Sequence, residues 1–522
     1  MRRAYDIAVF GSGFAGSLMA MIAKRLGHSV VLLERGRHPR MAIGESSTPL
    51  ANLLLEELAV RYNLPAIGPL AKWGSWQRAY PHLACGLKRG FTFYHHDLAA
   101  EDTPDPDHVR QLLVAASPHN EIADTHWYRA DFDSFLVEQA LAMGVDYLDE
   151  AKIDGFVEGR TEVSFNVLKS GQTTEVRAGF AVDATGPRGF LHRALQLQES
   201  SFPDYPATQT LYCHFSGVSR PCASMETDDR QQPPYPPEDA AVHHVFDGGW
   251  IWVLRFNNGM TSAGVAATKQ ASIRLNLSEG EAAWWRLIGT ISTLKEQFAS
   301  ARAEGPFTFV PQLTFLTDRI CGDRWAMLPS AAGFVDPLLS TGFPLTLLGL
   351  RRLTEIFGKH WGSPSLSSEL ESYAAKTREE LLATSQLVGS LYGNMNNFEV
   401  FKAISLLYFA AASYSETARR LGKPHLAQTF LLQDDRVFGP ACRDLLARSR
   451  RLTSEKESTL LVEDILRAIE PFDVAGLSKS NLSSWYPVDA EDLVQSASKV
   501  QATRGEIERM LQTCGFYGKE RR

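Results

Sequence analysis

A glycine-rich turn near the amino terminus constrains this chain more than any other feature. An apolar run covers residues 6–10, the turn Gly11-Ser-Gly-Phe-Ala-Gly16 follows, and an apolar-periodic stretch then runs through residues 14–25. A second apolar run at residues 30–33 completes the order strand, turn, helix, strand. This order predicts a Rossmann-like dinucleotide-binding unit. The alternative is a tight turn with a purely structural role.

The spacing within this unit predicts which residues contact the dinucleotide. The glycines let the backbone approach a pyrophosphate, and the start of the helix supplies aligned N–H donors with a partial positive charge. Glu34 ends the second strand 18 residues after Gly16, close to the spacing expected for a carboxylate on the adenosine ribose. The predicted contacts in this unit are Gly11, Gly13, Phe14, Ala15, Gly16, Glu34 and Arg35.

Three later features favour FAD over a nicotinamide dinucleotide. Asp183-Ala-Thr-Gly186 ends an apolar strand pattern, residues 196–305 read as an inserted sheet, and residues 333–342 form a late glycine-rich run. Together they indicate one flavin site. The expected fold class is α/β, or α+β overall, and its parts are a discontinuous Rossmann-like FAD-binding domain (1–195 plus 306–350), an inserted β-sheet substrate domain (196–305) and a helical C-terminal region covering the substrate cavity (351–522).

Charge and hydropathy favour small-molecule chemistry. The chain has 53 basic and 60 acidic residues, a net charge of -7, and no long basic run that would favour nucleic acid or an anionic membrane as a partner. Its longest apolar runs, such as residues 404–412, are too short to cross a bilayer. With 522 residues, 44% of them hydrophobic, the chain can bury two or three cores.

The cysteines and the amino terminus indicate a cytoplasmic protein. No two cysteines have C-x-x-C spacing and none has a histidine pattern for zinc, so we expect reduced thiols and no metal site. Met1 and two arginines lead directly into a strand pattern, without the cleavage site of a secretory signal. The six cysteines are Cys85, Cys213, Cys222, Cys321, Cys442 and Cys514.

Six motifs stand in order along the first 350 residues. They are GSGFAG (11–16), GES (44–46) followed by Thr48-Pro49, ACGLKRGFTF (84–93), DATG (183–186), Trp250-Ile-Trp252 and GFVDPLLSTG (333–342). In this order they resemble the flavin-dependent halogenases, within the wider family of single-FAD aromatic hydroxylases, and most of all the phenol-acting branch.

The resemblance implies a reaction and its reactants. Such an enzyme takes FADH2 from a separate NAD(P)H-dependent flavin reductase and uses O2 to oxidise a halide, chloride or bromide, to hypohalous acid. A tunnel then carries this oxidant to a free, electron-rich aromatic small molecule. The hard redox step belongs to the cofactor, whereas the protein binds halide, excludes water and aims the oxidant.

The resemblance also assigns roles to three residues at the reacting end of the flavin. Lys88 matches the lysine that holds hypohalous acid or carries the halogen as a haloamine, chemistry that suits a compact amine with a tunable pKa. Its alternative is a solvated lysine at a strand end. Thr341 and Gly342 match the residues whose backbone amides hold the halide. Their alternative is a loop that only packs on the flavin.

Further contacts are implied with less specific roles. Glu45 lies where the family's backbone approaches the flavin and couples flavin to halide binding, with helix capping or indirect support as the alternative. His95 and His96 are adjacent on a strand, so at most one faces the substrate, and a surface role is the alternative. The remaining implied cofactor contacts are Ser46, Asp183, Gly186, Asp336 and Gly342, and the implied tunnel or substrate wall is Trp250, Trp252 and Pro337.

Three departures from the family pattern bear on function. The usual W-x-W-x-I-P run ends here in Leu254 and Arg255, and the usual Gly-Asp pair before the late motif is Pro329-Ser330. Leu339 replaces the glutamate of the tryptophan-acting branch, which favours a phenol over an indole. One alternative function is an aromatic monooxygenase, which Arg255 favours and Lys88 opposes. The other is a non-catalytic flavin-binding partner protein.

Overall fold

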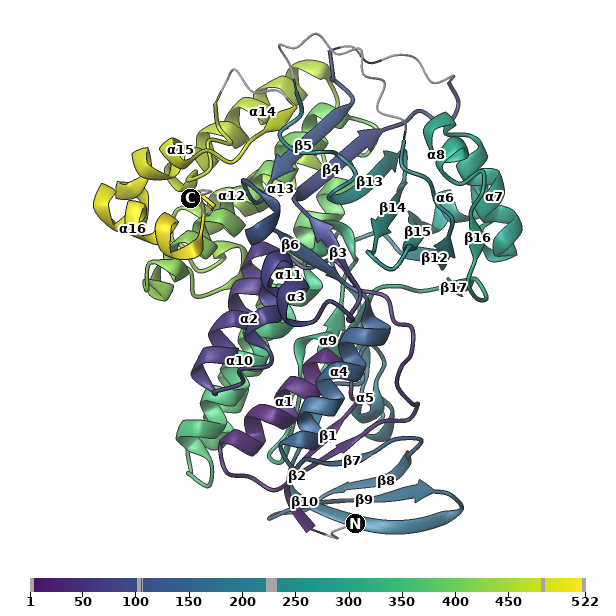
Figure 1. Ribbon diagram of the computed structural model, residues 1–522, viewed down its shortest axis with the longest axis vertical. Coiled ribbons are helices and arrows are strands. Elements are labelled where there is room, and N and C mark those ends of the chain that lie inside the picture. Colours follow the sequence, from purple (N-terminus) through teal and green to yellow (C-terminus); the bar gives the residue numbers. More distant parts are fainter. Residues whose placement is uncertain (1–3, 101–104, 106, 222–231, 480–483, 519–522) are drawn as a thin grey trace.

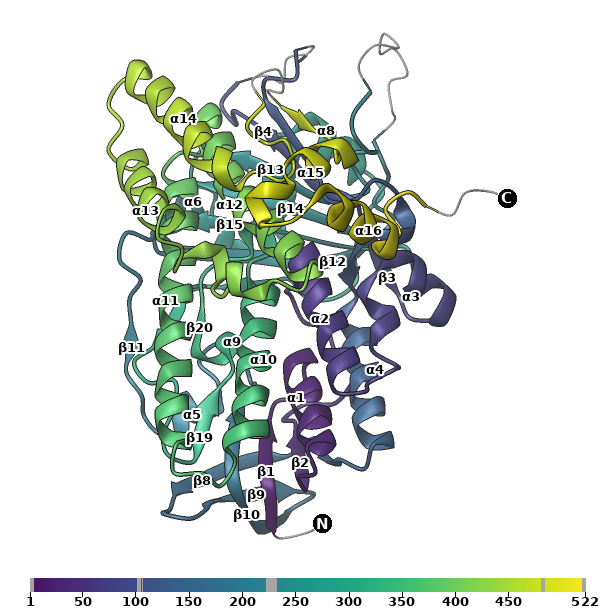
Figure 2. The ribbon, with the colours of Figure 1, turned by 90° about the vertical axis from the view of Figure 1, so that its left-hand side faces the viewer.

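The computed structural model describes residues 4–100, 105, 107–221, 232–479 and 484–518. Figure 1 shows the two largest sheets, one in the lower half of the molecule and one at the upper right, with helices between and beside them. The long helices on the green side of Figure 2 run from the lower half to the upper half and join the two. The expected mixed α/β fold class is confirmed.

The lower sheet is the Rossmann-like unit. Its strand order is β7-β2-β1-β10-β9-β8. The first part of β10 pairs with β9, and its last three residues pair with β19. The strands β7, β2, β1, β10 and β19 pair in parallel. The apolar residues of β2 and β19 and most of those of β1 and β10 are buried because helices cover the sheet, whereas β7 is only half-buried. The bounds are β1 (Ala4–Phe10), β2 (Val30–Leu33), β7 (Asp146–Leu148), β8 (Lys152–Glu158), β9 (Val163–Lys169), β10 (Gln172–Asp183) and β19 (Trp325–Met327).

Helices from distant parts of the chain pack on this unit. The helix of the glycine-rich turn, α1 (Phe14–Arg25), packs against α4 (Arg129–Ala142) and α10 (Gly342–His360), as Figure 2 shows for α10. The predicted helix start at Thr48 and Pro49 is also found, because α2 (Pro49–Arg61) begins there and the Thr48 hydroxyl accepts a hydrogen bond from Ala51 N at 3.2 Å.

The upper sheet extends beyond the segment predicted for it. Its order is β16-β12-β15-β14-β13-β4-β5-β21, with β17 on β12. Two strands expected in the FAD-binding domain belong here, because β4 (Gly90–His95) pairs in parallel with β13 (Ala241–Phe246) and brings β5 (Gln111–Ala115) with it. The other strands are β12 (Thr208–Ser216), β14 (Gly249–Arg255), β15 (Met260–Thr268), β16 (Arg302–Ala303), β17 (Thr308–Val310) and β21 (Trp485–Tyr486). Helices α6 (Lys269–Arg274), α7 (Glu281–Gly289) and α8 (Ser292–Gln297) lie at its outer side (Figure 1).

The last third of the chain is mainly helical. Among its helices, α12 is the most buried and packs against α2 and α14, so it lies between the two halves of the molecule. The bounds are α11 (Leu366–Tyr392), α12 (Phe398–Arg420), α13 (Phe438–Ser449), α14 (Glu455–Ile469), α15 (Ala490–Gln495) and α16 (Arg504–Cys514).

Three general properties of the described residues complete the fold. No helix among them has the length and apolar character that a membrane crossing requires. Their histidine, cysteine and carboxylate side chains form no group of three or more that could hold a metal ion. Each cysteine among them is a free thiol, whereas Cys222 lies outside the described residues.

Candidate active site

A cavity of about 900 Å³ lies along the glycine-rich turn. It runs from Glu34 and Arg35 past Gly13, Phe14 and Ala15 to the late glycine-rich segment. This volume lies at the upper end of the roughly 300–1,000 Å³ that small-molecule and cofactor pockets occupy. The predicted adenosine, pyrophosphate and halide ends of the site therefore share one cavity.

Two glycines of the turn are needed for backbone packing. Gly11 has φ of 90°, and a Cβ added there would lie 2.7 Å from Ala184 O. A Cβ on Gly16 would lie 1.8 Å from Gly11 O. These two residues bring the turn against the end of β10, and Gly11 and Gly13 line the cavity.

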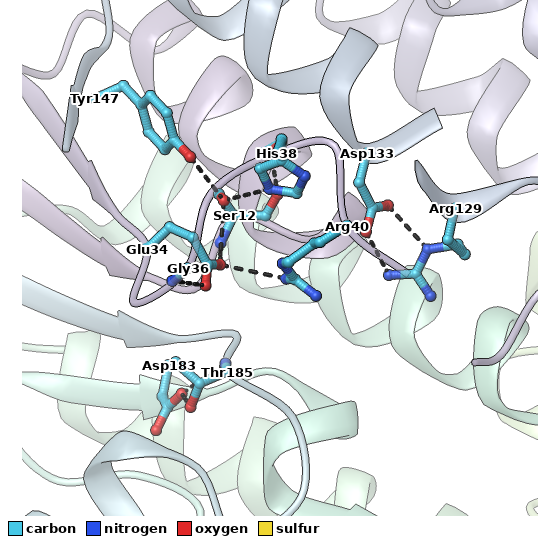
Figure 3. Close-up of polar contacts among 11 residues, drawn as sticks. Ser12, Glu34, Gly36, His38, Arg40, Arg129, Asp133, Tyr147, Asp183 and Thr185 are labelled. Atoms are coloured by element: carbon cyan, nitrogen blue, oxygen red, sulfur yellow. Dashed lines mark hydrogen bonds and ion pairs between the residues drawn. The ribbon is translucent and has the colours of Figure 1, made fainter. Parts of the chain in front are cut away.

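Glu34 is held in position at one end of the cavity (Figure 3). Its Oε1 accepts from Gly36 N at 2.9 Å, and its Oε2 accepts from Ser12 N at 3.0 Å. Arg40 lies 3.3 Å from the same oxygen. Burial alone would raise the pKa of Glu34, but the Gly36 N–H, the Arg40 guanidinium and Ser12 outweigh it and lower that pKa. A charged carboxylate therefore faces the cavity where ribose hydroxyls are expected.

Two arginines outside the predicted site residues, Arg40 and Arg129, also line the cavity (Figure 3). Arg129 donates to both oxygens of Asp133, at 2.9 and 2.8 Å, and to Gly44 O at 2.9 Å. The buried Nε of Arg40 has no acceptor among the described residues. Cations and an unused donor beside the glycine-rich turn fit the pyrophosphate of FAD. The i,i+4 spacing of Arg129 and Asp133 was the available sequence signal.

The late glycine-rich segment forms the opposite end of the cavity. Thr341 and Gly342 line it, and Gly342 begins α10, so its N–H is among those a helix leaves without an intrahelical acceptor. The preceding Leu339 and Ser340 have φ of 62° and 54°. This left-handed backbone is unfavourable for leucine, and such strain concentrates at functional sites. It turns the start of α10 toward the cavity.

Asp336 joins this segment to other parts of the fold. It lines the cavity, and its Oδ1 accepts from Leu338 N at 2.9 Å. Its Oδ2 accepts from Tyr205 Oη at 3.0 Å and from Tyr392 Oη at 2.9 Å. Burial raises the pKa of Asp336 to about 6, although these hydrogen bonds oppose the rise.

Several predicted site residues lie outside the cavity lining. Asp183 is buried and accepts from Thr185 N and Leu191 N, at 2.8 and 2.6 Å, so it holds the turn whose Thr185 and Gly186 line the cavity. Glu45 is buried with Oε1 2.7 Å from His214 Nε2. Four residues predicted as direct cofactor contacts therefore lie outside the cavity lining: Gly16, Glu45, Ser46 and Asp183.

The residues predicted to form the tunnel or substrate wall do not line the flavin cavity either. Trp250 Nε1 donates to Tyr392 Oη at 3.1 Å, and Trp252 Nε1 donates to Ser262 Oγ at 3.2 Å. Both indoles are buried and neither lines the flavin cavity, while Pro337 is half-buried at the start of the left-handed turn. Trp250 therefore reaches the cavity through Tyr392 and Asp336.

Lys88 is fully buried, which excludes the solvated lysine considered from the sequence. It ends β3 (Cys85–Lys88), which pairs with β6 (Asp124–Trp127) so that Lys88 stands opposite Asp124. Its Nζ donates to Ser46 Oγ at 2.9 Å and to Ser47 O, and lies 3.8 Å from the centre of the Phe91 ring. Burial lowers the pKa of Lys88 to about 7, and the charge of Asp124 opposes that fall.

A second, smaller cavity of about 150 Å³ lies beyond Lys88. Phe91 and Asp124, which interact with Lys88, both line it. The chain from Gly44 to Asn52 passes from the flavin cavity, past Lys88, to the second cavity. The expectation that the C-terminal helices cover a substrate cavity is consistent with its α12 and α16 lining.

The two histidines after the lysine motif do not have the bland surface role that the sequence favoured. His95 Nε2 lies 3.0 Å from Met395 O, and His96 Nε2 lies 2.9 Å from His244 Nδ1. Both are half-buried. Neither lines the flavin cavity or the second cavity.

Arg255 lines neither cavity. Its Nε lies 3.0 Å from Glu238, and its guanidinium donates to Gln297 Oε1 at 2.7 Å and to Val218 O at 3.1 Å. The residue that replaces the family's proline therefore joins β14 to a loop and to α8.

Comparison with known proteins identifies a family for this geometry. Residues 122–398 match the family model described as tryptophan halogenase. The tetracycline 7-halogenase of Kitasatospora aureofaciens is 27% identical over 422 residues, 78% of this chain and 74% of that protein. The monodechloroaminopyrrolnitrin halogenase PrnC of Pseudomonas fluorescens is 26% identical over 77% of this chain and 70% of its own length.

Solved structures share the fold. The halogenase PltM in complex with phloroglucinol and FAD aligns with a TM-score of 0.77 at 22% identity, over 92% of this chain and 99% of that one. The flavin-dependent brominase Bmp2 aligns with a TM-score of 0.61 at 18% identity, over 86% and 98%.

Proposed function

Because this chain belongs to the tryptophan halogenase family and is a flavin-dependent halogenase, we propose that it halogenates a free, electron-rich phenol through Lys88. FAD, a halide and O2 are the cofactor and cosubstrates of this class. A separate NAD(P)H-dependent flavin reductase supplies the reduced flavin. The observation that carries the proposal is the complete burial of Lys88 between the flavin cavity and a second, aromatic cavity.

Residues of this chain would hold FAD along the large cavity. When bound, the reduced flavin supplies the electrons with which O2 oxidises the halide to hypohalous acid. Glu34 would accept hydrogen bonds from the ribose hydroxyls, and the glycine-rich turn with Arg40 and Arg129 would hold the pyrophosphate. The backbone at Thr341 and Gly342 holds the halide, since a helix start favours an anion.

Lys88 would present the oxidant to the substrate. Its ammonium has three N–H donors, two of which are directed to Ser46 and Ser47, so one remains for the oxygen of hypohalous acid. The lowered pKa also lets the amine release that proton as the oxygen leaves. Burial keeps water from consuming or diluting the oxidant.

Two observations support a phenol. Leu339 stands where the tryptophan-acting branch has a glutamate, and a phenol needs less activation because its own oxygen donates electrons to the ring. The chain also shares its fold with PltM, which was solved in complex with phloroglucinol. Arg255, which favoured a hydroxylase, lines neither cavity and is paired with Glu238 and Gln297.

A reconstituted reaction tests this function. Purified protein, FAD, a flavin reductase, NADH and a panel of phenols would be incubated with chloride, bromide or no halide, and the products identified by mass spectrometry. We expect halogenated phenol only where halide is present. Lys88→Met should abolish it, whereas Lys402→Met, which removes another buried lysine near a phenyl ring, should not. Hydroxylated products, or halogenation that survives Lys88→Met, would contradict the proposal.

A further inference from the structure

The second cavity has the size and lining for one aromatic ring. Its walls include the aromatic side chains of Phe91, Tyr408 and Phe409, and a cavity of about 150 Å³ has room for a benzene ring. Charged residues also line it, namely Glu56, Lys72, Glu416 and Arg420. Two polar groups interrupt this lining at the Lys88 side, namely Asp124 and Asn52. Both are buried, with 5% and 3% of their surfaces exposed.

These two side chains leave acceptor atoms unused. Asn52 Nδ2 donates to Asp124 Oδ1 at 2.8 Å, which fixes the carboxylate in place. Among the described residues, nothing donates a hydrogen bond to Asp124 Oδ2 or to Asn52 Oδ1. A buried acceptor without a donor costs free energy, and such groups in native structures call for a reason. A ligand that carries hydroxyl donors on an aromatic ring would satisfy both atoms.

We propose that Asp124 is a catalytic residue that binds the phenolic hydroxyl in this cavity and accepts its proton while Lys88 presents the halogen. This inference rests on the proposed halogenase function and names the group that recognises its substrate. The register of β3 and β6 supports it, because Lys88 and Asp124 are direct cross-strand partners. Asp124 therefore lines the cavity, and Lys88 lies buried directly behind it on the neighbouring strand.

The other charged groups near Asp124 are already paired. Glu416 and Arg420, both on α12, form an ion pair with Arg420 Nε 2.7 Å from Glu416 Oε1. Lys88, on β3, is the cation opposite Asp124, and Tyr408 of α12 is a neutral neighbour. Burial raises the pKa of Asp124, whereas Lys88 and Asn52 oppose the rise, so the carboxylate is a better proton acceptor than a solvated aspartate.

The proposed step balances in atoms and electrons. The phenolic proton passes to Asp124, and the electron pair released on oxygen makes the ring carbon nucleophilic. That carbon forms a bond to the halogen as the halogen–oxygen bond of hypohalous acid breaks, and the oxygen takes a proton from the Lys88 ammonium and leaves as water. The ring then loses its C–H proton to the Lys88 amine, and Asp124 returns its proton to the phenol oxygen.

Selectivity between a phenol and its methyl ether tests this role. The ether keeps the ring but lacks the donor. In the wild-type holoenzyme we expect the phenol to have a kcat/KM about 10- to 100-fold above that of the ether, the usual effect of one hydrogen bond to a charged group. Asp124→Asn, which keeps the shape of the side chain, should lose most of that preference. Asp6→Asn, which changes a carboxylate bonded to Ser29 far from both cavities, should keep it.

Two more measurements separate this proposal from the function on which it rests. Halide-dependent hypohalous acid, trapped by a soluble 1,3-diketone, should form in wild type and in Asp124→Asn alike, and its absence from wild type would refute the halogenase function alone. Calorimetric titration of the FAD-loaded proteins with resorcinol, without turnover, should give a Kd about tenfold or more weaker for Asp124→Asn. Equal affinity of both proteins for resorcinol, or an unchanged phenol preference in Asp124→Asn, would overturn the role of Asp124.

Discussion

Replacing Tyr392 by phenylalanine tests whether Asp336 is held at the flavin cavity as a charged acceptor. The Tyr392 hydroxyl donates to Asp336 Oδ2 at 2.9 Å and accepts from Trp250 Nε1 at 3.1 Å. A hydrogen bond to a charged group contributes about 1.5–3 kcal/mol, which corresponds to about one to two pKa units at roughly 1.36 kcal/mol each. Tyr392→Phe should therefore raise the pKa of Asp336 above its present value of about 6.

The consequence for stability depends on pH. Because burial raises the pKa of Asp336 from 3.8 to about 6, its ionisation opposes folding as pH rises above 3.8, and the full penalty is reached above the folded pKa. At pH 5 Asp336 is mostly protonated in both folded proteins, so the substitution removes only neutral contacts. At pH 8 the variant carries the larger ionisation penalty. The destabilisation by Tyr392→Phe should be about 1.5–3 kcal/mol greater at pH 8 than at pH 5.

Thermal unfolding of the FAD-free proteins at the two pH values measures this difference. At about 2.1 cal/mol/K per residue, a chain of 522 residues unfolds with an entropy of about 1.1 kcal/mol/K, so the Tm loss should be about 1–3 °C larger at pH 8. Tyr373→Phe is the matched control, because the buried Tyr373 hydroxyl donates to the Met327 carbonyl at 2.7 Å, which does not titrate. If both variants lose the same Tm at both pH values, Tyr392 does not stabilise a charged Asp336.

Three further predictions concern the flavin cavity and Lys88. Gly16→Ala places a methyl group 1.8 Å from a backbone oxygen of the same turn, so the affinity for FAD should fall at least about tenfold in a fluorescence titration. Gly289→Ala is the control, because its Cβ meets nothing within 4 Å, and this variant should bind FAD normally. Arg129→Gln leaves the carboxylate of Asp133 buried without its cation, which costs about 3–5 kcal/mol of stability. Adding Asp133→Asn to this variant should restore most of the lost Tm. A double variant as unstable as the single one would contradict a stabilising ion pair between Arg129 and Asp133. Single-turnover halogenation of the phenol methyl ether, which has no hydroxyl proton for Asp124 to accept, should slow as pH rises above neutral, because burial lowers the pKa of Lys88 and the ammonium donor is lost. A rate that stays level from pH 6 to 9 would exclude Lys88 as the proton donor.

The dinucleotide-binding unit could be predicted because its determinants are close together in the chain. The turn from Gly11 to Gly16 follows from glycine conformation and from the strand and helix on either side of it, and Glu34 then falls at the end of the adjacent parallel strand. The start of α2 at Thr48 and Pro49 is predictable for the same reason, since a capping side chain and a proline act within one helical turn.

Contacts between distant segments could not be predicted in this way. Asp124 follows Lys88 by 36 residues, and only the antiparallel register of β3 and β6 places them opposite each other. Glu45 and His214 are 169 residues apart in the chain. The same limit explains why β4 belongs to a sheet that the sequence did not predict for it, because its apolar pattern predicts a strand without indicating that its partner is β13 in the upper sheet.

The helical C-terminal region connects one of the two tryptophans, Trp250, to the flavin cavity. Trp250 lies in the upper sheet and Asp336 lies in the flavin cavity, and their link is the hydroxyl of Tyr392 at the end of α11. Asp336 in turn holds Leu338 N, three residues before Thr341. A change in how α11 packs therefore reaches the proposed halide position through two hydrogen bonds and one short turn. By this geometry, substitutions at the end of α11 should alter halide affinity although α11 contributes only Leu381 to the lining of the flavin cavity.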